Sequence, residues 1–404
     1  MLGLLIFKIL ILISPLTGIA KEMPESDILK IHNKALTVDT HVDTPMILVN
    51  QGLDLGKRNT PPESRVDFIR MQEGGLDAIF FAAFTSQKER TPENIESAYK
   101  LAHQMIDSTL VSCEKYKNLV SLATRASDAE RLNKEGLKAI YIGLENGFPI
   151  GTDLSRIKEF YDRGVRYITL SHSKNNDICD SSSDIKGPEH NGLSEFGKQV
   201  IMKMNKLGIM IDVSHISDKA FYDVIQISNA PVIASHSSVR AIANHNRNMT
   251  DEMIRTLAKN GGVIQICLLD DYIKNPDQTT TRYKKMQELR NIYNTHFDKM
   301  NEEEQSAFRK LWSETSNKYP KQLPTVKDLV DHIDHVKNLV GIDYVGIGSD
   351  FDGGGGLADC QDVSQFPNIT REMHNRGYSE EDIYKVWGGN FFRVFHKVEE
   401  LAEN

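Results

Sequence analysis

Along most of the chain, short apolar runs rich in β-branched residues alternate with longer segments whose apolar residues recur every three or four positions. The first pattern is typical of buried parallel strands, and the second of helices that pack against them. Eight such runs occur, at 36–43, 76–84, 138–146, 167–172, 209–215, 231–237, 262–268 and 344–350. They predict an α/β fold of the (β/α)8 TIM-barrel type. A doubly wound open sheet is the alternative, because sequence alone does not show closure.

The seventh and eighth runs are separated by residues 269–343, far more chain than one crossover helix needs. This segment is charged and helical in pattern, as in RYKKMQELRNIYNTHFDKM and EEEQSAFRKLW. We expect a helical insertion that caps the barrel, because loops at this end shape specificity. A contact between subunits and a plain solvated excursion are the alternatives.

Six of the eight runs end in a residue type that binds metal ions or transfers protons. These residues are His41 and Asp43, Glu145, His172, His215, His236 and Asp350. One such ending, like the His-x-Asp pair at the first run, is a weak signal that a polar strand end explains equally well. The carboxyl ends of barrel strands converge on the face where active sites are built. Six endings together therefore predict one shared pocket.

The residue types in this set indicate a metal centre. Three histidines with Asp43 and Glu145 are more ligands than one tetrahedral zinc needs, and they suit two ions with a glutamate between them. Imidazole and carboxylate favour zinc, although manganese, cobalt and iron accept the same ligands. Two ions about 3.5–4 Å apart share a hydroxide and polarise a carbonyl. The expected reaction is hydrolysis of an amide, with an ester or phosphoester as the weaker alternative.

Composition narrows the class of protein further. Of the 404 residues, 40% are hydrophobic and 26% charged, as in globular domains. The net charge of −8 comes without a basic cluster, which argues against nucleic acid as a partner. Cys113, Cys179, Cys267 and Cys360 are widely separated, without a C-x-x-C pair. We expect free or structural thiols rather than a cysteine metal cluster.

The first twenty residues, MLGLLIFKILILISPLTGIA, are apolar and end in small residues. They resemble a secretory signal peptide cleaved after Ala20, which leaves 21–404 as a single barrel domain. A membrane anchor is the rival interpretation, but the run is short and Lys8 interrupts it. The polar C-terminal residues carry no lipid-anchor signal. We therefore expect a secreted or periplasmic protein with no membrane span after removal of the signal.

The strings THVDTP, GLEN, TLSHSKNN, DVSH, ASHSSVRAIANHNRNMTD and GIGSDFDGG occur in this order, and the similarity runs from about Thr37 to Phe395. Together they resemble the membrane (renal) dipeptidase family of zinc peptidases, within the metal-dependent hydrolase barrels. His-x-Asp in place of the His-x-His of most barrel amidohydrolases is the most discriminating element. The resemblance implies a dipeptidase with two zinc ions. L,L-dipeptides, dipeptides with a C-terminal D-residue and some β-lactams all fit the resemblance, and the motifs do not choose among these substrates. The resemblance also hints at a homodimer.

Position by position, the resemblance implies a set of metal ligands. His41 and Asp43 would bind one zinc ion, His215 and His236 the second, and Glu145 would bridge the two.

The resemblance implies three substrate-facing residues as well. His172 would face the substrate carbonyl and stabilise the developing oxyanion. Arg247, in HNRN, would bind the terminal carboxylate of the dipeptide. Asp350 would act as the acid/base that orients the hydroxide and protonates the leaving amine. With Glu145, these residues form the predicted catalytic and substrate-binding set.

Several other histidines and glycines resemble functional motifs but are expected to have structural roles. His332 and His335 imitate a ligand pair on an amphipathic helix, but we expect them on the outer ring of the barrel. The glycines of DFDGGGG, from Gly353 to Gly356, are expected to form a flexible loop beside the pocket rather than a phosphate cradle. His190 is expected at the pocket rim. Mammalian members of the family pair a cysteine just after the substrate-facing histidine, but this place reads HSKN here, which leaves that disulfide in doubt.

Two alternatives to a dipeptidase stay open. One is another two-metal amidohydrolase, such as a deacetylase or lactonase, against which the His-x-Asp pair and Arg247 argue. The other is a catalytically silent binding protein that has kept the fold.

Overall fold

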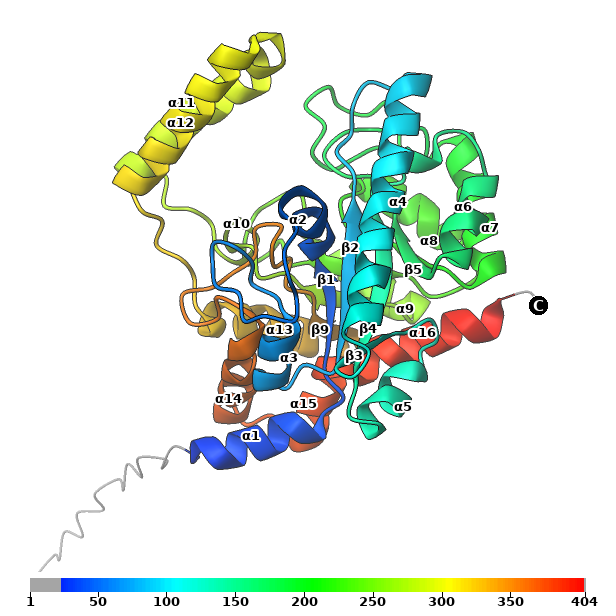
Figure 1. Ribbon diagram of the computed structural model, residues 1–404, viewed down its shortest axis with the longest axis vertical. Coiled ribbons are helices and arrows are strands. Elements are labelled where there is room, and N and C mark those ends of the chain that lie inside the picture. Colours follow the sequence, from blue (N-terminus) through cyan, green and yellow to red (C-terminus); the bar gives the residue numbers. More distant parts are fainter. Residues whose placement is uncertain (1–22, 403–404) are drawn as a thin grey trace, which may run out of the picture.

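The computed structural model describes residues 23–402, so the predicted signal peptide lies outside the described part of the chain. Its centre is a sheet of parallel strands that curves into a barrel (Figure 1). The strand order is β1 (Val38–Val42), β2 (Ala78–Phe84), β4 (Lys138–Glu145), β5 (Val165–Thr169), β6 (Met210–Asp212), β7 (Ile233–Ser237), β8 (Val263–Ile266) and β9 (Val345–Ile347). A short extra strand that sequence reasoning missed, β3 (Val120–Leu122), pairs with β4 outside this path.

The barrel closes where its first and last strands meet. A parallel bridge joins Val42 to Phe351, just beyond β9. The Asp43 N–H donates to the Phe351 carbonyl at 2.9 Å, and the Asp350 N–H donates to the His41 carbonyl at 3.0 Å. The predicted (β/α)8 barrel is therefore confirmed, and the open-sheet alternative is wrong.

Alternate side chains of each strand pack on opposite faces, as the two-residue repeat of a strand requires. In β2, Ile79 and Phe81 belong to the core shared with the surrounding helices. Ala78 and Phe80 belong to a second cluster that includes Phe391 of α16 (Asn390–Leu401). Figure 1 shows α16 at the end of the barrel remote from α2 (Thr44–Gln51). This packing leaves the opposite end, at the strand C-termini, free for polar residues.

Helices follow the strands and cover the barrel. Several of them begin at a Ser or Thr whose side chain accepts the backbone N–H three residues on, as at Ser194, Ser217 and Thr250. The helices outside the insertion are α1 (Glu25–Lys34), α2, α3 (Phe68–Glu73), α4 (Pro92–Lys115), α5 (Asp128–Lys134), α6 (Ser155–Asp162), α7 (Glu195–Leu207), α8 (Asp218–Ile227), α9 (Asp251–Asn260), α14 (Pro367–Asn375), α15 (Glu380–Tyr384) and α16. Among the described residues, no helix is long and apolar enough to cross a membrane.

The long segment between β8 and β9 is helical. It contains α10 (Asp270–Ile273), α11 (Thr281–His296), α12 (Glu302–Lys318) and α13 (Val326–Val340). Helix α13 packs on the barrel, whereas α11 and α12 form a hairpin that projects away from it (yellow in Figure 1). The hairpin has a small core of its own, made of Met286, Leu289 and Phe308.

His332 and His335 lie on α13, in the helical ring around the barrel as expected, but the His332 side chain is buried. Its imidazole is fully buried: Nδ1 accepts the Val239 N–H at 3.0 Å, and Nε2 donates to the Ile273 carbonyl at 2.9 Å. His335 instead pairs with Asp251 at 2.8 Å. His332 thus joins α13, the β7–α9 loop and α10 as a neutral ring.

Burial lowers the pKa of His332 to about 4, although its bond to Ile273 opposes the shift. Below pH 6.5 the unfolded chain gains a proton at this position that the folded chain does not, so stability falls as the pH drops towards 4. We expect this histidine to account for a loss of about 2–3 kcal/mol. Urea unfolding at pH 7 and pH 4.5 should show a smaller loss in His332→Asn than in the wild type. Equal losses in the two proteins would contradict the assignment.

Candidate active site

A cavity of about 430 Å³ opens at the C-terminal ends of the strands. Its polar lining includes Asp43, Glu145, His172, His215, Arg247 and Asp350, which are six of the eight predicted site residues. The other two, His41 and His236, are buried and contact Glu145. Apolar lining comes from Met46, Ile47, Phe84, Leu269 and Tyr272. The structure therefore brings all eight residues together.

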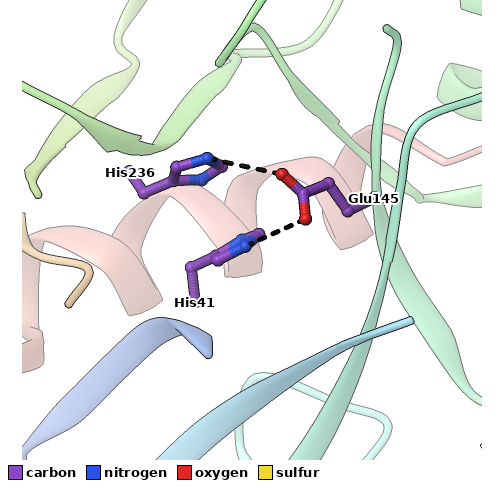
Figure 2. A group of neighbouring side chains, drawn as sticks. All are labelled: His41, Glu145 and His236. Atoms are coloured by element: carbon purple, nitrogen blue, oxygen red, sulfur yellow. Dashed lines mark ion pairs between the residues drawn. The ribbon is translucent and has the colours of Figure 1, made fainter. Parts of the chain in front are cut away.

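Glu145 lies at the centre of the group. Its Oε2 is 3.4 Å from His41 Nε2, and its Oε1 is 3.1 Å from His215 Nε2 and 3.5 Å from His236 Nε2. Figure 2 shows the carboxylate between His41 and His236, with one oxygen facing each ring. The His172 Nε2 is also near, at 3.7 Å. A carboxylate with imidazoles on both oxygens has the arrangement of a bridging ligand.

Three groups of side chains in the described part of the chain have ligand atoms within 4.8 Å of one another. These groups are His41–Glu145–His236, Glu145–His172–His215 and His41–Asp43–Asp350. They overlap at Glu145 and at His41. Two atoms that face the group, His41 Nε2 and Asp43 Oδ1, are buried without a hydrogen-bond partner. Because buried polar atoms are nearly always paired, these two fit the requirements of a bound cation.

The charges of the group are also unbalanced without a cation. Burial raises the pKa of Asp43, and the nearby Glu145 raises it further. Burial also raises the pKa of Asp350 to about 7, with Glu145 adding to the shift and His41 opposing it. Although burial alone would lower it, the carboxylate of Glu145 raises the pKa of His41 to about 10. Divalent cations would hold these carboxylates ionised and these imidazoles neutral.

A second layer of hydrogen bonds orients the histidines. His41 Nδ1 lies 2.8 Å from the Tyr167 hydroxyl, and His236 Nδ1 lies 2.9 Å from Ser235 Oγ. Ser235 Oγ in turn donates to Asp212 at 2.6 Å. With both Nδ1 atoms donating, the Nε2 lone pairs face Glu145, as metal-binding histidines require. Tyr167, Ser235 and Asp212 were not predicted from the sequence, although Asp212 also lies at the end of a strand.

Two predicted site residues have a strained backbone. His215 has φ 71° and Asp350 has φ 58°, and the neighbours Asn146 and Asp352 have φ 74° and 68°. Non-glycine residues rarely adopt this left-handed region, which costs about 1–3 kcal/mol each. The strain turns these residues sharply at the strand ends, where the cavity lies.

Arg247 is buried beside the cavity rather than solvated. Its Nη2 donates to the His236 carbonyl at 3.0 Å, and its guanidinium lies 5.2 Å from the centre of the Tyr272 ring. Its Nε is buried without a hydrogen-bond partner. His172 packs between Phe84 and His215, with a quarter of its side chain exposed. Both side chains are therefore held by their neighbours in the lining of the cavity. Burial lowers the pKa of His172, which favours its neutral form.

The glycine run after β9 forms a bonded turn. The Gly353 and Gly355 N–H groups both donate to the Asp350 carbonyl, at 3.2 and 2.7 Å. A Cβ on Gly353 would overlap the carboxylates of Asp43 and Asp350. The glycine is needed because the backbone passes directly behind these two side chains.

Replacing Gly353 with alanine is therefore expected to displace Asp43 and Asp350 while the fold survives. A misplacement near 1 Å costs about 10²-fold in rate, so we expect kcat/KM to fall by about that factor. Gly389→Ala is a matched control, since a Cβ there meets only ordinary contacts. Steady-state kinetics and thermal unfolding of both variants check the prediction. Unchanged kinetics in Gly353→Ala would contradict it.

The insertion reaches the cavity only at its beginning. Leu269 and Tyr272 line it, whereas none of the lining residues comes from α11 or α12. The expected cap is thus limited to the α10 region. All four cysteines are buried and unpaired, in line with the expected structural thiols. His190 lies near the loop after β5, where its Nε2 is 2.8 Å from the Asn176 carbonyl.

The sequence and the structure of this chain were compared with those of known proteins, and the matches include several to dipeptidases. Residues 25–404 match the sequence profile of the family described as Membrane dipeptidase (Peptidase family M19). The chain is 32% identical to the dipeptidase tcpJ of Claviceps purpurea over 342 residues, which covers 83% of this chain and 70% of that protein. The structure resembles that of the probable dipeptidase PvdM from Pseudomonas aeruginosa, with a TM-score of 0.85 and 30% identity. That match covers 94% of this chain and 99% of the other.

Proposed function

Because this chain belongs to the membrane dipeptidase family and is a dipeptide-hydrolysing enzyme, we propose that it works with two zinc ions. Their ligands would be His41, Asp43, Glu145, His215 and His236. The observation that carries this proposal is the position of Glu145, with imidazole nitrogens within 3.5 Å of both its oxygens. The unpartnered His41 Nε2 and Asp43 Oδ1 support it.

The metal ions would polarise the scissile carbonyl and acidify the attacking water. Proton transfer and stabilisation of the developing negative charge are assigned to two side chains of the protein. Asp350 accepts a proton from the attacking water and delivers it to the leaving amine. His172, on the wall of the cavity, donates a hydrogen bond to the carbonyl oxygen as negative charge develops there.

Arg247 would select dipeptides by their length. Arg247 lines the same small cavity as the metal ligands, and its buried Nε has no hydrogen-bond partner. A carboxylate bound by this guanidinium would then be one residue from the scissile bond. Longer peptides would place an amide, not a carboxylate, against the guanidinium. Recognition through the carboxylate makes few demands on the side chain, so the proposal includes dipeptides with a C-terminal D-residue.

The test is a substrate panel with metal-depleted and reconstituted protein. L,L and L,D dipeptides, N-acetylated amino acids and lactones would be compared after addition of zinc, manganese or cobalt. We expect no turnover without metal and dipeptide hydrolysis restored by two equivalents of zinc. Hydrolysis of lactones or N-acetylated amino acids without dipeptides would favour the deacetylase or lactonase alternative. Metal binding with no hydrolysis at all would favour the silent binding protein.

We also propose that the protein is secreted or periplasmic, on the strength of residues 1–20. Mass spectrometry of the protein from its own cells should find Lys21 at the N-terminus. Retention of the first twenty residues would contradict cleavage.

A further inference from the structure

Arg247 belongs to the loop between β7 and α9, and this loop is tightly folded beside the cavity. A parallel bridge joins Val239, near the start of the loop, to Met249, near its end. The side chain of Asn248 donates to the Tyr272 carbonyl of α10 at 2.8 Å. The loop is therefore attached both to itself and to the segment that forms the neighbouring wall of the cavity.

Within this loop, His245 contacts Arg247 and the aromatic ring beside it. Its Nδ1 accepts the Arg247 backbone N–H at 3.1 Å. The ring of His245 lies 4.7 Å from the ring of Tyr272, measured between ring centres. The guanidinium of Arg247 lies on the same tyrosine, 5.2 Å from its ring centre. His245 thus touches both the backbone of Arg247 and the surface on which its guanidinium rests.

The hydrogen bond to Arg247 needs a neutral imidazole, because a protonated Nδ1 cannot accept an N–H. Burial lowers the pKa of His245, and the positive charge of Arg247 lowers it further, with Asp271 opposing the shift. The ring is therefore neutral near pH 7, and its Nδ1 is free to accept.

The side chain of Arg247 is also held at its far end, where Nη2 donates to the His236 carbonyl at 3.0 Å. With the backbone N–H fixed by His245 at one end and Nη2 fixed at the other, the guanidinium keeps one orientation. Its buried Nε then stays available in a constant direction. A donor that is oriented before the ligand arrives binds more tightly, because less freedom is lost on binding.

We propose that His245 is a positioning residue, which sets the affinity of Arg247 for the terminal carboxylate of the dipeptide. The inference rests on the proposed function of Arg247 in binding that carboxylate. The carboxylate is bound alike in the substrate complex and in the transition state, since it takes no part in the chemistry. Loss of such uniform binding raises KM and leaves kcat unchanged.

Two substitutions separate the two contacts of His245. His245→Phe keeps a ring against Tyr272 but removes the acceptor, and it should raise KM for a dipeptide about tenfold with kcat within about twofold. His245→Asn removes the ring but keeps an acceptor for the N–H two residues on, so KM should stay within about threefold of the wild type. His245→Ala removes both contacts and should raise KM at least as much as His245→Phe.

The C-terminal amide of the same dipeptide distinguishes positioning from a general disturbance. The amide offers no carboxylate to Arg247, so its kcat/KM should change by less than about twofold in His245→Phe. His335→Leu is the matched control, because His335 is also half-buried and hydrogen-bonded, but on α13 with Asp251 as its partner. Its kinetics on both substrates should equal those of the wild type. Circular dichroism and zinc content show that each variant is folded and loaded.

A folded His245→Phe or His245→Ala protein with the wild-type KM for the dipeptide would overturn the proposal. So would equal losses on the dipeptide and on its amide, which indicate a structural disturbance alone. A wild type that hydrolyses the amide as well as the dipeptide would refute the proposed role of Arg247, and this inference with it. A wild type that prefers the dipeptide, together with an unchanged KM in the variants, would refute only the role of His245.

Discussion

Replacing Asp350 with asparagine is expected to lower kcat for dipeptides by about 10²–10⁴-fold, the usual contribution of a general acid/base. The two side chains have nearly the same shape, but the amide cannot accept a proton from water or deliver one to the leaving amine. Asp350 is suited to that task because its carboxylate lines the cavity beside His41 and Asp43. Steady-state kinetics on one good dipeptide would measure the change in kcat and in KM separately.

Metal content separates this role from that of a ligand. We expect Asp350→Asn to retain as much zinc as the wild type, measured by plasma mass spectrometry after dialysis. Ser183→Ala is the matched control, since Ser183 lines the same cavity without a proposed role, and its kcat should stay near the wild-type value. Loss of one zinc ion in Asp350→Asn would show that Asp350 is a ligand, which its place beside His41 and Asp43 also allows.

Replacing Glu145 with glutamine is expected to abolish measurable turnover, a loss of at least about 10³-fold, because both metal ions would lose their shared anionic ligand. The bound zinc should fall from two ions per chain to one or fewer. The four imidazoles around this carboxylate would then have no negative partner at its position. Metal analysis and kinetics on the same preparation check both parts of the prediction.

The contrast with Asp350→Asn makes the result specific. Glu145→Gln should lose metal and activity together, whereas Asp350→Asn should lose activity alone. A Glu145→Gln protein with two zinc ions and normal kinetics would refute the bridging role. Thermal unfolding of both variants in the presence of chelator provides the baseline for folding.

The barrel and the residues of its pocket could be predicted because each strand, and the functional residue that ends it, can be recognised from neighbouring positions in the sequence. Strands such as 138–146 carry a continuous apolar run, and the residue that ends it, Glu145, lies next to its own strand. Because the C-terminal ends of barrel strands converge on one face, residues far apart in the sequence could then be expected in one pocket. The missed strand β3 has only three residues, too few for a pattern.

Other parts of the site depend on packing that the sequence does not display. Tyr167 reaches His41 across 126 residues of chain, and Ser235 connects Asp212 to His236 through the barrel interior. The burial of His332 arises in the same way, because its two partners belong to other segments. The left-handed backbone at His215 and Asp350 has no marker either, since neither residue is a glycine.

Where the barrel closes, the segment that follows β9 is hydrogen-bonded to the segment that follows β1. Asp352 accepts hydrogen bonds from Thr44 Oγ1 and Ser64 Oγ, both at 2.7 Å, and from the Arg65 N–H, across some three hundred residues. On the ribosome, His41 and Asp43 are thus made long before the residues that face them. A nascent chain therefore contains most residues of the site before Asp350, but the site is complete only after β9, the last strand, has been synthesised.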